Sequence, residues 1–84
     1  MKVKVVFFAS LREDMGIEEI FLQLPEGCTT DSLLEVLSAR LGEKAVSLLC
    51  GDSVRIAVNQ EMLDGRAHLF ENDEVAYFPR ITGG

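Results

Sequence analysis

The spacing of apolar residues changes along this 84-residue chain, and that change constrains the fold more than any other feature. Residues 2–8 alternate between two faces, residues 9–16 form a polar connection, and residues 17–24 alternate again. A period of two is typical of strands, so these segments predict a β-hairpin. Pro25 then removes a backbone donor, and we expect the second strand to end before it.

In the middle of the chain the apolar residues stand three and four positions apart, which is the period of a helix. They are Leu33, Leu34, Leu37 and Leu41. We expect this helix to begin near Thr30, a good N-cap, or at a capping box of Ser32 and Glu35, and to stop at Gly42. Residues 45–50 are also apolar and predict one more helical turn.

Strand periodicity returns in the last third of the chain. Residues 54–58 predict a third strand, residues 59–64 a tight reversal, and residues 74–78 a last strand. In the irregular stretch between them, Leu63 and Leu69 are the apolar residues that we expect to face the core.

The resulting order is strand, strand, helix, strand, irregular segment, strand. Such a set predicts an α+β fold with one mixed sheet and one main helix packed on one face, because neither can bury its apolar side alone. The β-grasp, or ubiquitin-like, architecture fits this order. We expect it to span residues 1–78, followed by a flexible, extended C-terminal tail at residues 79–84.

The acidic charge of the chain limits its partners. With a net charge of −6 and scattered lysines and arginines, it repels phosphate backbones and anionic lipid headgroups. We therefore expect no nucleic-acid partner and no membrane partner. The start of the chain lacks the apolar run of a signal peptide, which predicts a cytoplasmic location.

No combination of side chains suggests an independent active site or a bound cofactor. Cys28 and Cys50 are far apart in sequence, and His68 cannot complete a metal shell with them, so we expect no metal site. Each cysteine is predicted to be a small core residue, with a sulfur relay as the alternative. Neighbouring carboxylates on a strand point to opposite faces and form no acid-base pair.

The C-terminal tail is the one feature with an evident chemical use. Two glycines at the last two positions have a chance probability of about 0.5% at an average glycine usage of roughly 7%. Six extended residues reach about 20 Å, enough for the carboxylate of Gly84 to enter a buried site in another protein. Gly83 and Gly84 lack a Cβ and therefore fit a narrow channel. Adenylation with ATP by a partner would give that carboxylate a leaving group, and a sulfide equivalent would then yield a thiocarboxylate.

Four stretches make the chain similar to the ubiquitin-like sulfur carriers, and within them to the small subunits of molybdopterin synthase. They are residues 5–13, with Val-Val-Phe-Phe-Ala-Ser-Leu-Arg-Glu, residues 58–60, with Val-Asn-Gln, residues 73–79, with Asp-Glu-Val-Ala-Tyr-Phe-Pro, and residues 82–84, with Thr-Gly-Gly. The terminal glycines are shared by every branch of these carriers. The Phe-Phe-Ala and Leu-Arg-Glu start points toward the molybdopterin branch.

The resemblance implies three partners. An adenylating, E1-like enzyme would activate Gly84 with ATP, and a sulfurtransferase system would supply sulfur. The tail would insert into the large subunit of molybdopterin synthase, which holds the catalytic side chains and converts cyclic pyranopterin monophosphate into the dithiolene of molybdopterin. The inserted residues before the glycines would be Pro79, Arg80, Ile81 and Thr82.

The resemblance also implies a partner surface. Phe78 and Met62 match an exposed apolar patch that contacts both large partners in the family, although in the bare sequence each also fits a core position. Arg80 stands where the usual tail has a second proline, so we expect a less stiff tail and an arginine able to pair with an acidic partner group.

Three other functions fit parts of the same sequence. A carrier for thiamine thiazole or for tRNA thiolation would use the same tail, although the insertion at residues 45–50 and the Phe7-Phe8-Ala9 start disfavour it. A ubiquitin-like modifier would join Gly84 to lysines of other proteins. A plain binding module would not need Gly84.

Overall fold

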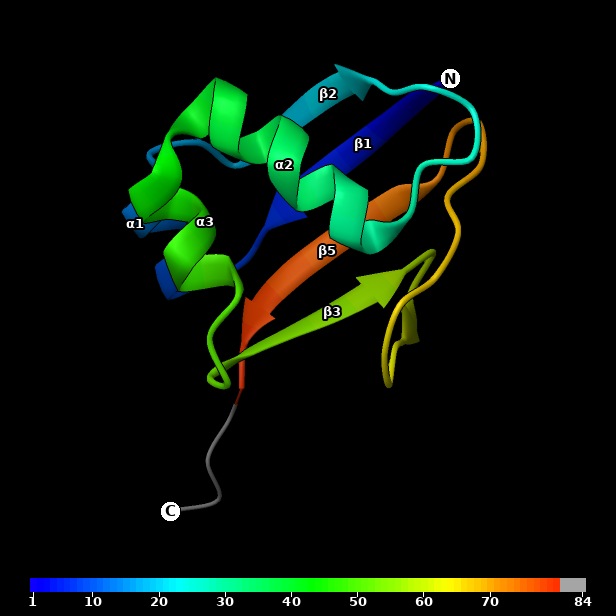
Figure 1. Ribbon diagram of the computed structural model, residues 1–84. Helices are drawn as coiled ribbons and strands as arrows, with labels where there is room; N and C mark the ends of the chain where they lie inside the picture. Colours follow the sequence, from blue (N-terminus) through cyan, green and yellow to red (C-terminus); the bar gives the residue numbers. More distant parts are fainter. Residues whose placement is uncertain (81–84) are drawn as a thin grey trace.

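The computed structural model describes residues 1–80 and arranges them as one sheet with helices over one face (Figure 1). The elements are β1 (Lys2–Phe7), α1 (Ser10–Met15), β2 (Glu19–Gln23), α2 (Thr30–Leu41), α3 (Glu43–Leu49), β3 (Val54–Val58), β4 (Glu61–Met62) and β5 (Glu74–Pro79). None of these helices is long and apolar enough to cross a membrane.

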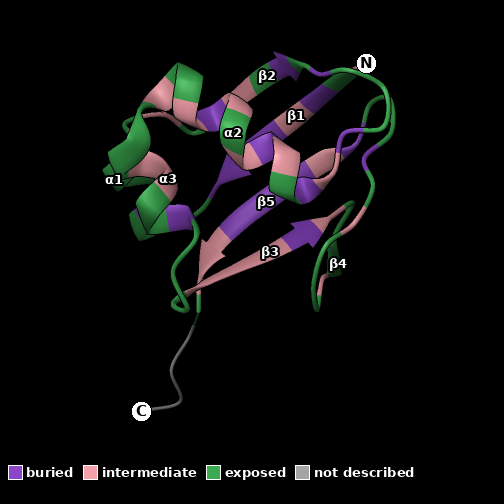
Figure 2. Ribbon diagram, in the orientation of Figure 1, coloured by how far each residue is buried: buried purple, intermediate pink, exposed green. Residues whose placement is uncertain are grey.

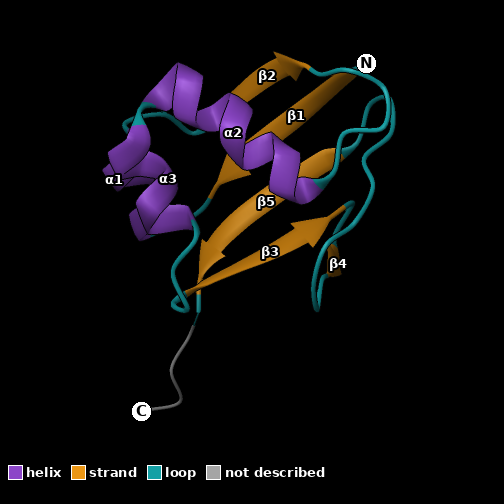
Figure 3. Ribbon diagram, in the orientation of Figure 1, coloured by secondary structure: helices purple, strands orange, loops and turns teal. Residues whose placement is uncertain are grey.

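The five strands form a mixed sheet in the order β2-β1-β5-β3-β4. The first and last strands, β1 and β5, run parallel at its centre, whereas the other neighbours are antiparallel. Helix α2 crosses the sheet on one face, as Figure 3 shows. The predicted hairpin and the predicted β-grasp fold are both confirmed.

The core lies between α2 and the inner face of the sheet, where buried residues concentrate (Figure 2). Phe7 of β1 stacks on Tyr77 of β5 with ring centroids 6.0 Å apart. Leu33 and Leu37 of α2 are fully buried against this sheet. Burying each such leucine stabilises the fold by about 1.5–3 kcal/mol relative to an exposed side chain. The helix therefore packs with the face that carries these leucines against the sheet.

Helix α2 begins at Thr30, so its N-cap lies one residue before the predicted cap. Thr29 is the N-cap, and its hydroxyl oxygen accepts a hydrogen bond from the Ser32 N–H at 3.2 Å. Thr30 is buried instead, and its hydroxyl accepts from the Ala67 N–H. The predicted stop at Gly42 is confirmed, because this residue has φ 98° and its N–H bonds to the Ser38 carbonyl.

Two connections differ from the prediction. The segment after β1 was predicted as a polar connection, but it contains helix α1. Only Leu11 of this helix is buried, so no apolar period indicates a helix there. The second short helix, α3, begins at Glu43 and not at residue 45. Leu69 is buried as predicted, but Leu63 is only half-buried because it follows the edge strand β4.

Candidate functional site

The end of β5 fixes the point at which the C-terminal tail leaves the domain. The predicted last strand ends at Phe78, but the structure extends it by one residue, with Pro79 opposite Val54 of β3. The Arg80 N–H then donates to the Ser53 carbonyl at 2.6 Å. The sheet and the loop before β3 therefore hold the chain as far as Arg80.

Four of the predicted tail residues lie outside the described part of the chain. They are Ile81, Thr82, Gly83 and Gly84. The reach of the tail and the role of its terminal carboxylate stay predictions. What the structure contributes is the surface from which those residues start.

An open groove of about 280 Å³ surrounds that starting point; we name it the exit groove. Its lining residues are Arg55, Met62, Phe78, Pro79 and Arg80. Because Tyr77 faces the core, the pleat of β5 turns Phe78 to the sheet face opposite α2. Phe78 is half-buried there and Met62 is 51% exposed, so the structure brings together the two residues that the sequence proposed as a partner surface.

Sequence reasoning missed Arg55, which lines the exit groove, and Phe8, which is bonded to β5 just before the groove. Arg55 lies directly opposite Phe78 in the register of β3 and β5. Phe8 follows β1, is 46% exposed, and donates its N–H to the Tyr77 carbonyl. The alternation of Phe7 and Phe8 already put Phe8 on the outer face, whereas the position of Arg55 depends on strand pairing that no local pattern reveals.

The exit groove carries positive charge on an otherwise acidic protein. Within residues 1–80, neither Arg55 nor Arg80 forms an ion pair, whereas Lys4, Arg12 and Arg66 each pair with a carboxylate. The groove thus combines apolar side chains with two available guanidinium groups. Such a surface fits a partner patch that is apolar at its centre and acidic at its rim.

Comparison with known proteins decides the family. The match to the ThiS family covers residues 5–84, which include every residue of the exit groove. The chain belongs to the ThiS family.

Two curated relatives of this ThiS-family chain are similar along nearly their whole length. The molybdopterin synthase sulfur carrier subunit of Escherichia coli (strain K12) is 36% identical over 84 residues, covering 98% of this chain and 99% of the relative. The protein of the same name from Haemophilus influenzae is 33% identical over 82 residues, again with 98% and 99% coverage.

Solved structures share the fold of the chain. A putative molybdopterin converting factor subunit 1 from Pyrococcus furiosus has a TM-score of 0.82 at 33% identity, covering 96% of this chain and 99% of that one. The small archaeal modifier protein 1 from Methanosarcina acetivorans has a TM-score of 0.76 at 27% identity, with 99% and 96% coverage. A chain in the complex of subunits 1 and 2 of a Helicobacter pylori molybdopterin-converting factor reaches 0.70 at 22% identity, both chains being fully covered, and shows the fold alone.

The two thiols of this ThiS-family chain differ in environment. Cys28 is buried, as predicted, and its Sγ donates to the Thr29 carbonyl at 3.6 Å. The prediction for Cys50 was wrong, because Leu49 turns into the core at the end of α3 and leaves Cys50 exposed. Within residues 1–80, no three histidine, cysteine or acidic residues gather in a way that would hold a metal ion.

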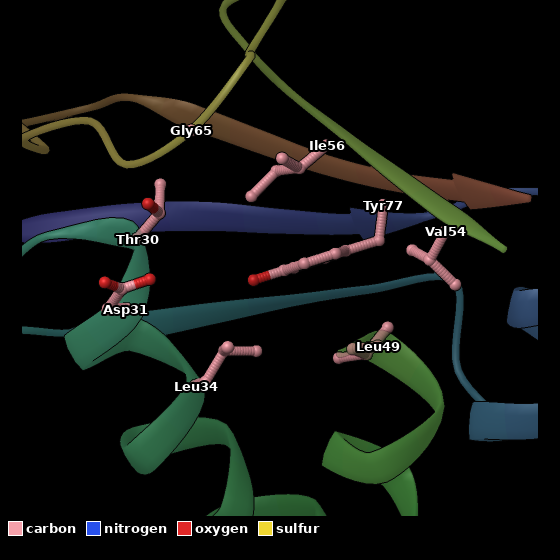
Figure 4. Close-up of a pocket in the computed structure, with 8 residues that line it drawn as sticks. All are labelled: Thr30, Asp31, Leu34, Leu49, Val54, Ile56, Gly65 and Tyr77. Carbon is pink, nitrogen blue, oxygen red and sulfur yellow. The ribbon is translucent and has the colours of Figure 1, made fainter. Parts of the chain in front are cut away.

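A cavity of about 120 Å³ lies between α2, α3 and β3 (Figure 4). The Tyr77 ring extends into it between Leu34, Leu49 and Ile56, and its hydroxyl has no hydrogen-bond partner among residues 1–80. Burial, with smaller contributions from Cys50 and Asp31, raises the pKa of the Tyr77 hydroxyl well above its ordinary value. The hydroxyl therefore stays protonated at neutral pH and offers no general base.

Replacing Tyr77 by phenylalanine should raise the free energy of unfolding by about 1 kcal/mol at neutral pH, because it removes an unpaired buried polar group. In the unfolded chain this tyrosine ionises with a pKa of about 10, whereas the folded protein keeps the proton. Ionisation of the unfolded chain therefore leaves the free energy of unfolding unchanged below about pH 10 and lowers it above that pH, by up to about 1.4 kcal/mol per pH unit. Tyr77 is the only tyrosine, so the variant should lack this decline. Urea unfolding of both proteins at neutral and alkaline pH measures it; a less stable variant at neutral pH would show that the hydroxyl has a partner.

Proposed function

We propose that this chain is the sulfur carrier subunit of a molybdopterin synthase and that the carboxylate of Gly84 carries the sulfur. The observation that carries the proposal is the pair of terminal glycines three and four residues after Arg80, whose N–H bonds to the Ser53 carbonyl at the end of β5. Full-length similarity to molybdopterin synthase sulfur carrier subunits supports it. The ATP and reduced sulfur that the reaction consumes favour work in the cytoplasm.

The proposed chemistry has two steps, both supplied by partners. A carboxylate oxygen of Gly84 attacks the α-phosphorus of ATP in an adenylating enzyme, which releases pyrophosphate and leaves an acyl adenylate. A sulfide equivalent from a sulfurtransferase system then attacks the acyl carbon, forms the C–S bond and expels AMP. The thiocarboxylate sulfur is the nucleophile that the large subunit of molybdopterin synthase would direct at cyclic pyranopterin monophosphate.

The exit groove supplies what a carrier needs from its own surface. Met62 and Phe78 provide apolar area for docking, and Arg55 and Arg80 provide cations beside the start of the tail. Docking there would leave Gly83 and Gly84 free to enter the active site of the partner. We propose that the adenylating enzyme and the large subunit use this same surface in turn.

A protein modifier is the second candidate, favoured by the likeness to the small archaeal modifier protein 1 of Methanosarcina acetivorans. It would share the adenylation step, after which the nitrogen of a lysine side chain would replace the adenylate to form an isopeptide bond. A carrier for thiamine thiazole or tRNA thiolation would differ only in the final acceptor.

The intact mass of the protein purified from its own cells tests the proposal. We expect a fraction whose mass exceeds the sequence mass by one oxygen-to-sulfur exchange, and we expect it equally in a Cys28→Ala/Cys50→Ser double variant. That variant removes every thiol, and a mass gain located in the fragment after Arg80, which contains no methionine, distinguishes a C-terminal thiocarboxylate from an oxidised methionine. A sulfur that disappears with the thiols would support a relay through cysteine, and conjugates without any thiocarboxylate would support the modifier.

A further inference from the structure

A second open groove, of about 320 Å³, lies at the other end of β5. We name it the Phe70 groove, and the residues in it that matter here are Glu61, Leu63, Ala67, His68, Phe70 and Asp73. Strand β5 begins beside this groove and ends beside the exit groove. Most of its lining residues belong to the loop that leads into β5, which is yellow to orange in Figure 1.

Phe70 is held in an exposed position by a closed network of hydrogen bonds. The Asp73 carboxylate accepts from the Phe70 N–H and from the Asn59 side-chain amide, both at 2.8 Å. The Asp73 N–H returns to the Phe70 carbonyl, and the Asn72 N–H bonds to Lys2 of β1. The ring is nevertheless 67% exposed. These hydrogen bonds fix the backbone that carries a large, exposed aromatic side chain. Binding a partner at Phe70 would therefore cost little backbone conformational entropy.

The charge of the Phe70 groove defines what it can bind. Glu61 and Asp73 form no ion pair within residues 1–80, and the donors to Asp73 are neutral. Only His68 among the lining residues can become positive. The groove therefore presents apolar surface together with negative charge.

Phe21, another exposed phenylalanine, differs from Phe70 because a cation lies over its ring. Phe21 is 51% exposed on β2, and the Lys2 ammonium lies 5.0 Å from the centre of its ring. Within residues 1–80, no cation covers the ring of Phe70. An aromatic ring that lines the same groove as the exposed Glu61 carboxylate is suited to a guanidinium, which is planar and both stacks and forms paired hydrogen bonds.

We propose that the Phe70 groove docks a segment of a partner protein in which an arginine adjoins an apolar side chain. The guanidinium stacks on Phe70 and pairs with Glu61, while the apolar side chain packs on Leu63 and Ala67. A second copy of this chain is a poor occupant, since each copy carries a net charge of −6.

The same partner that receives the tail can reach both grooves. Met62 lines the exit groove, and its neighbours Glu61 and Leu63 line the Phe70 groove. Alternation turns these neighbours to opposite faces of the sheet, so a partner that wraps around the edge strand β4 would contact both grooves. In this form the inference rests on the proposed function, which supplies the identity of that partner.

The first test measures the affinity of Phe70→Ala and Glu61→Gln variants for the large subunit and for the adenylating enzyme. Phe70→Ala should weaken the affinity of at least one complex by about tenfold or more. Glu61→Gln should make the affinity of that complex less dependent on salt concentration. Phe21→Ala is the matched control and should change neither affinity more than about twofold. All three variants should melt like the natural protein; equal affinities for Phe70→Ala and Phe21→Ala with both partners would overturn the inference.

A second test needs no partner enzyme. A blocked hexapeptide that alternates leucine and arginine is titrated into the labelled protein, beside a matched peptide with glutamate in place of arginine. We expect amide NMR shifts in residues 58–73 with the arginine peptide alone, reduced in Phe70→Ala. Shifts confined to the exit groove, or self-association that Phe70→Ala abolishes, would contradict the proposal. Peptide binding in a protein that never gains sulfur at Gly84 would keep this inference and remove the proposed function.

Discussion

Deleting Gly84 is expected to abolish sulfur transfer and to leave folding unchanged. The truncated chain still ends in a carboxylate, but that group would stop about 3.3 Å short of its position in the active site of a partner. Misplacement of a reacting group by about 1 Å costs on the order of a hundredfold in rate, so a loss of at least this size is expected. The core that the structure describes ends at Tyr77, seven residues before Gly84, so we expect the melting temperature not to change.

A reconstituted assay of molybdopterin formation, run beside thermal unfolding, measures this effect. Gly84→Ala is the matched variant, because it keeps the length of the tail and its carboxylate and adds only a Cβ. We expect it to fall between the natural protein and the truncated one if the channel of the partner is narrow. Molybdopterin formation by the truncated chain at a normal rate would refute the carrier assignment.

The fold was predictable where periodicity and burial agree. The alternation in β1 and the three-and-four spacing in α2 both reflect faces buried against one core, so local sequence determined these elements. Helix α1 was not predictable in this way, since Leu11 is its one buried residue. The residue before that helix, Ala9, adopts φ 52°. Residues other than glycine rarely adopt this backbone conformation, and no local pattern predicts it.

The two candidate surfaces depend more on strand pairing than on local pattern. Phe78 and Met62 were found through resemblance to a family, whereas the position of Arg55 beside them follows from the register of β3 and β5. The Phe70 groove requires the contact between Asn59 and Asp73, which are 14 residues apart. Such contacts arise only when the sheet has formed, and for this reason the sequence alone did not reveal them.

Replacing Phe78 by alanine should weaken binding to both the adenylating enzyme and the large subunit. An aromatic anchor near the centre of an interface commonly contributes about 2 kcal/mol or more, which corresponds to roughly a thirtyfold loss of affinity. Phe78 fits that role because it faces away from the core, is half-buried beside Met62, and precedes the tail directly. A fully buried phenylalanine would instead cost about 3 kcal/mol or more of stability on truncation.

Thermal unfolding beside affinity measurements with both partners separates these two roles of Phe78. We expect a modest loss of stability, because the side chain is only partly buried, together with a large loss of affinity for both proteins. Phe21→Ala, an exposed aromatic on the distant edge strand β2, provides the control and should affect neither complex. Strong destabilisation with unchanged affinity in the folded fraction would assign Phe78 to the core. A loss of affinity in only one complex would mean that the two partners use different surfaces. Equal losses of affinity would support one shared surface, so that the carrier could bind the adenylating enzyme and the large subunit only in turn.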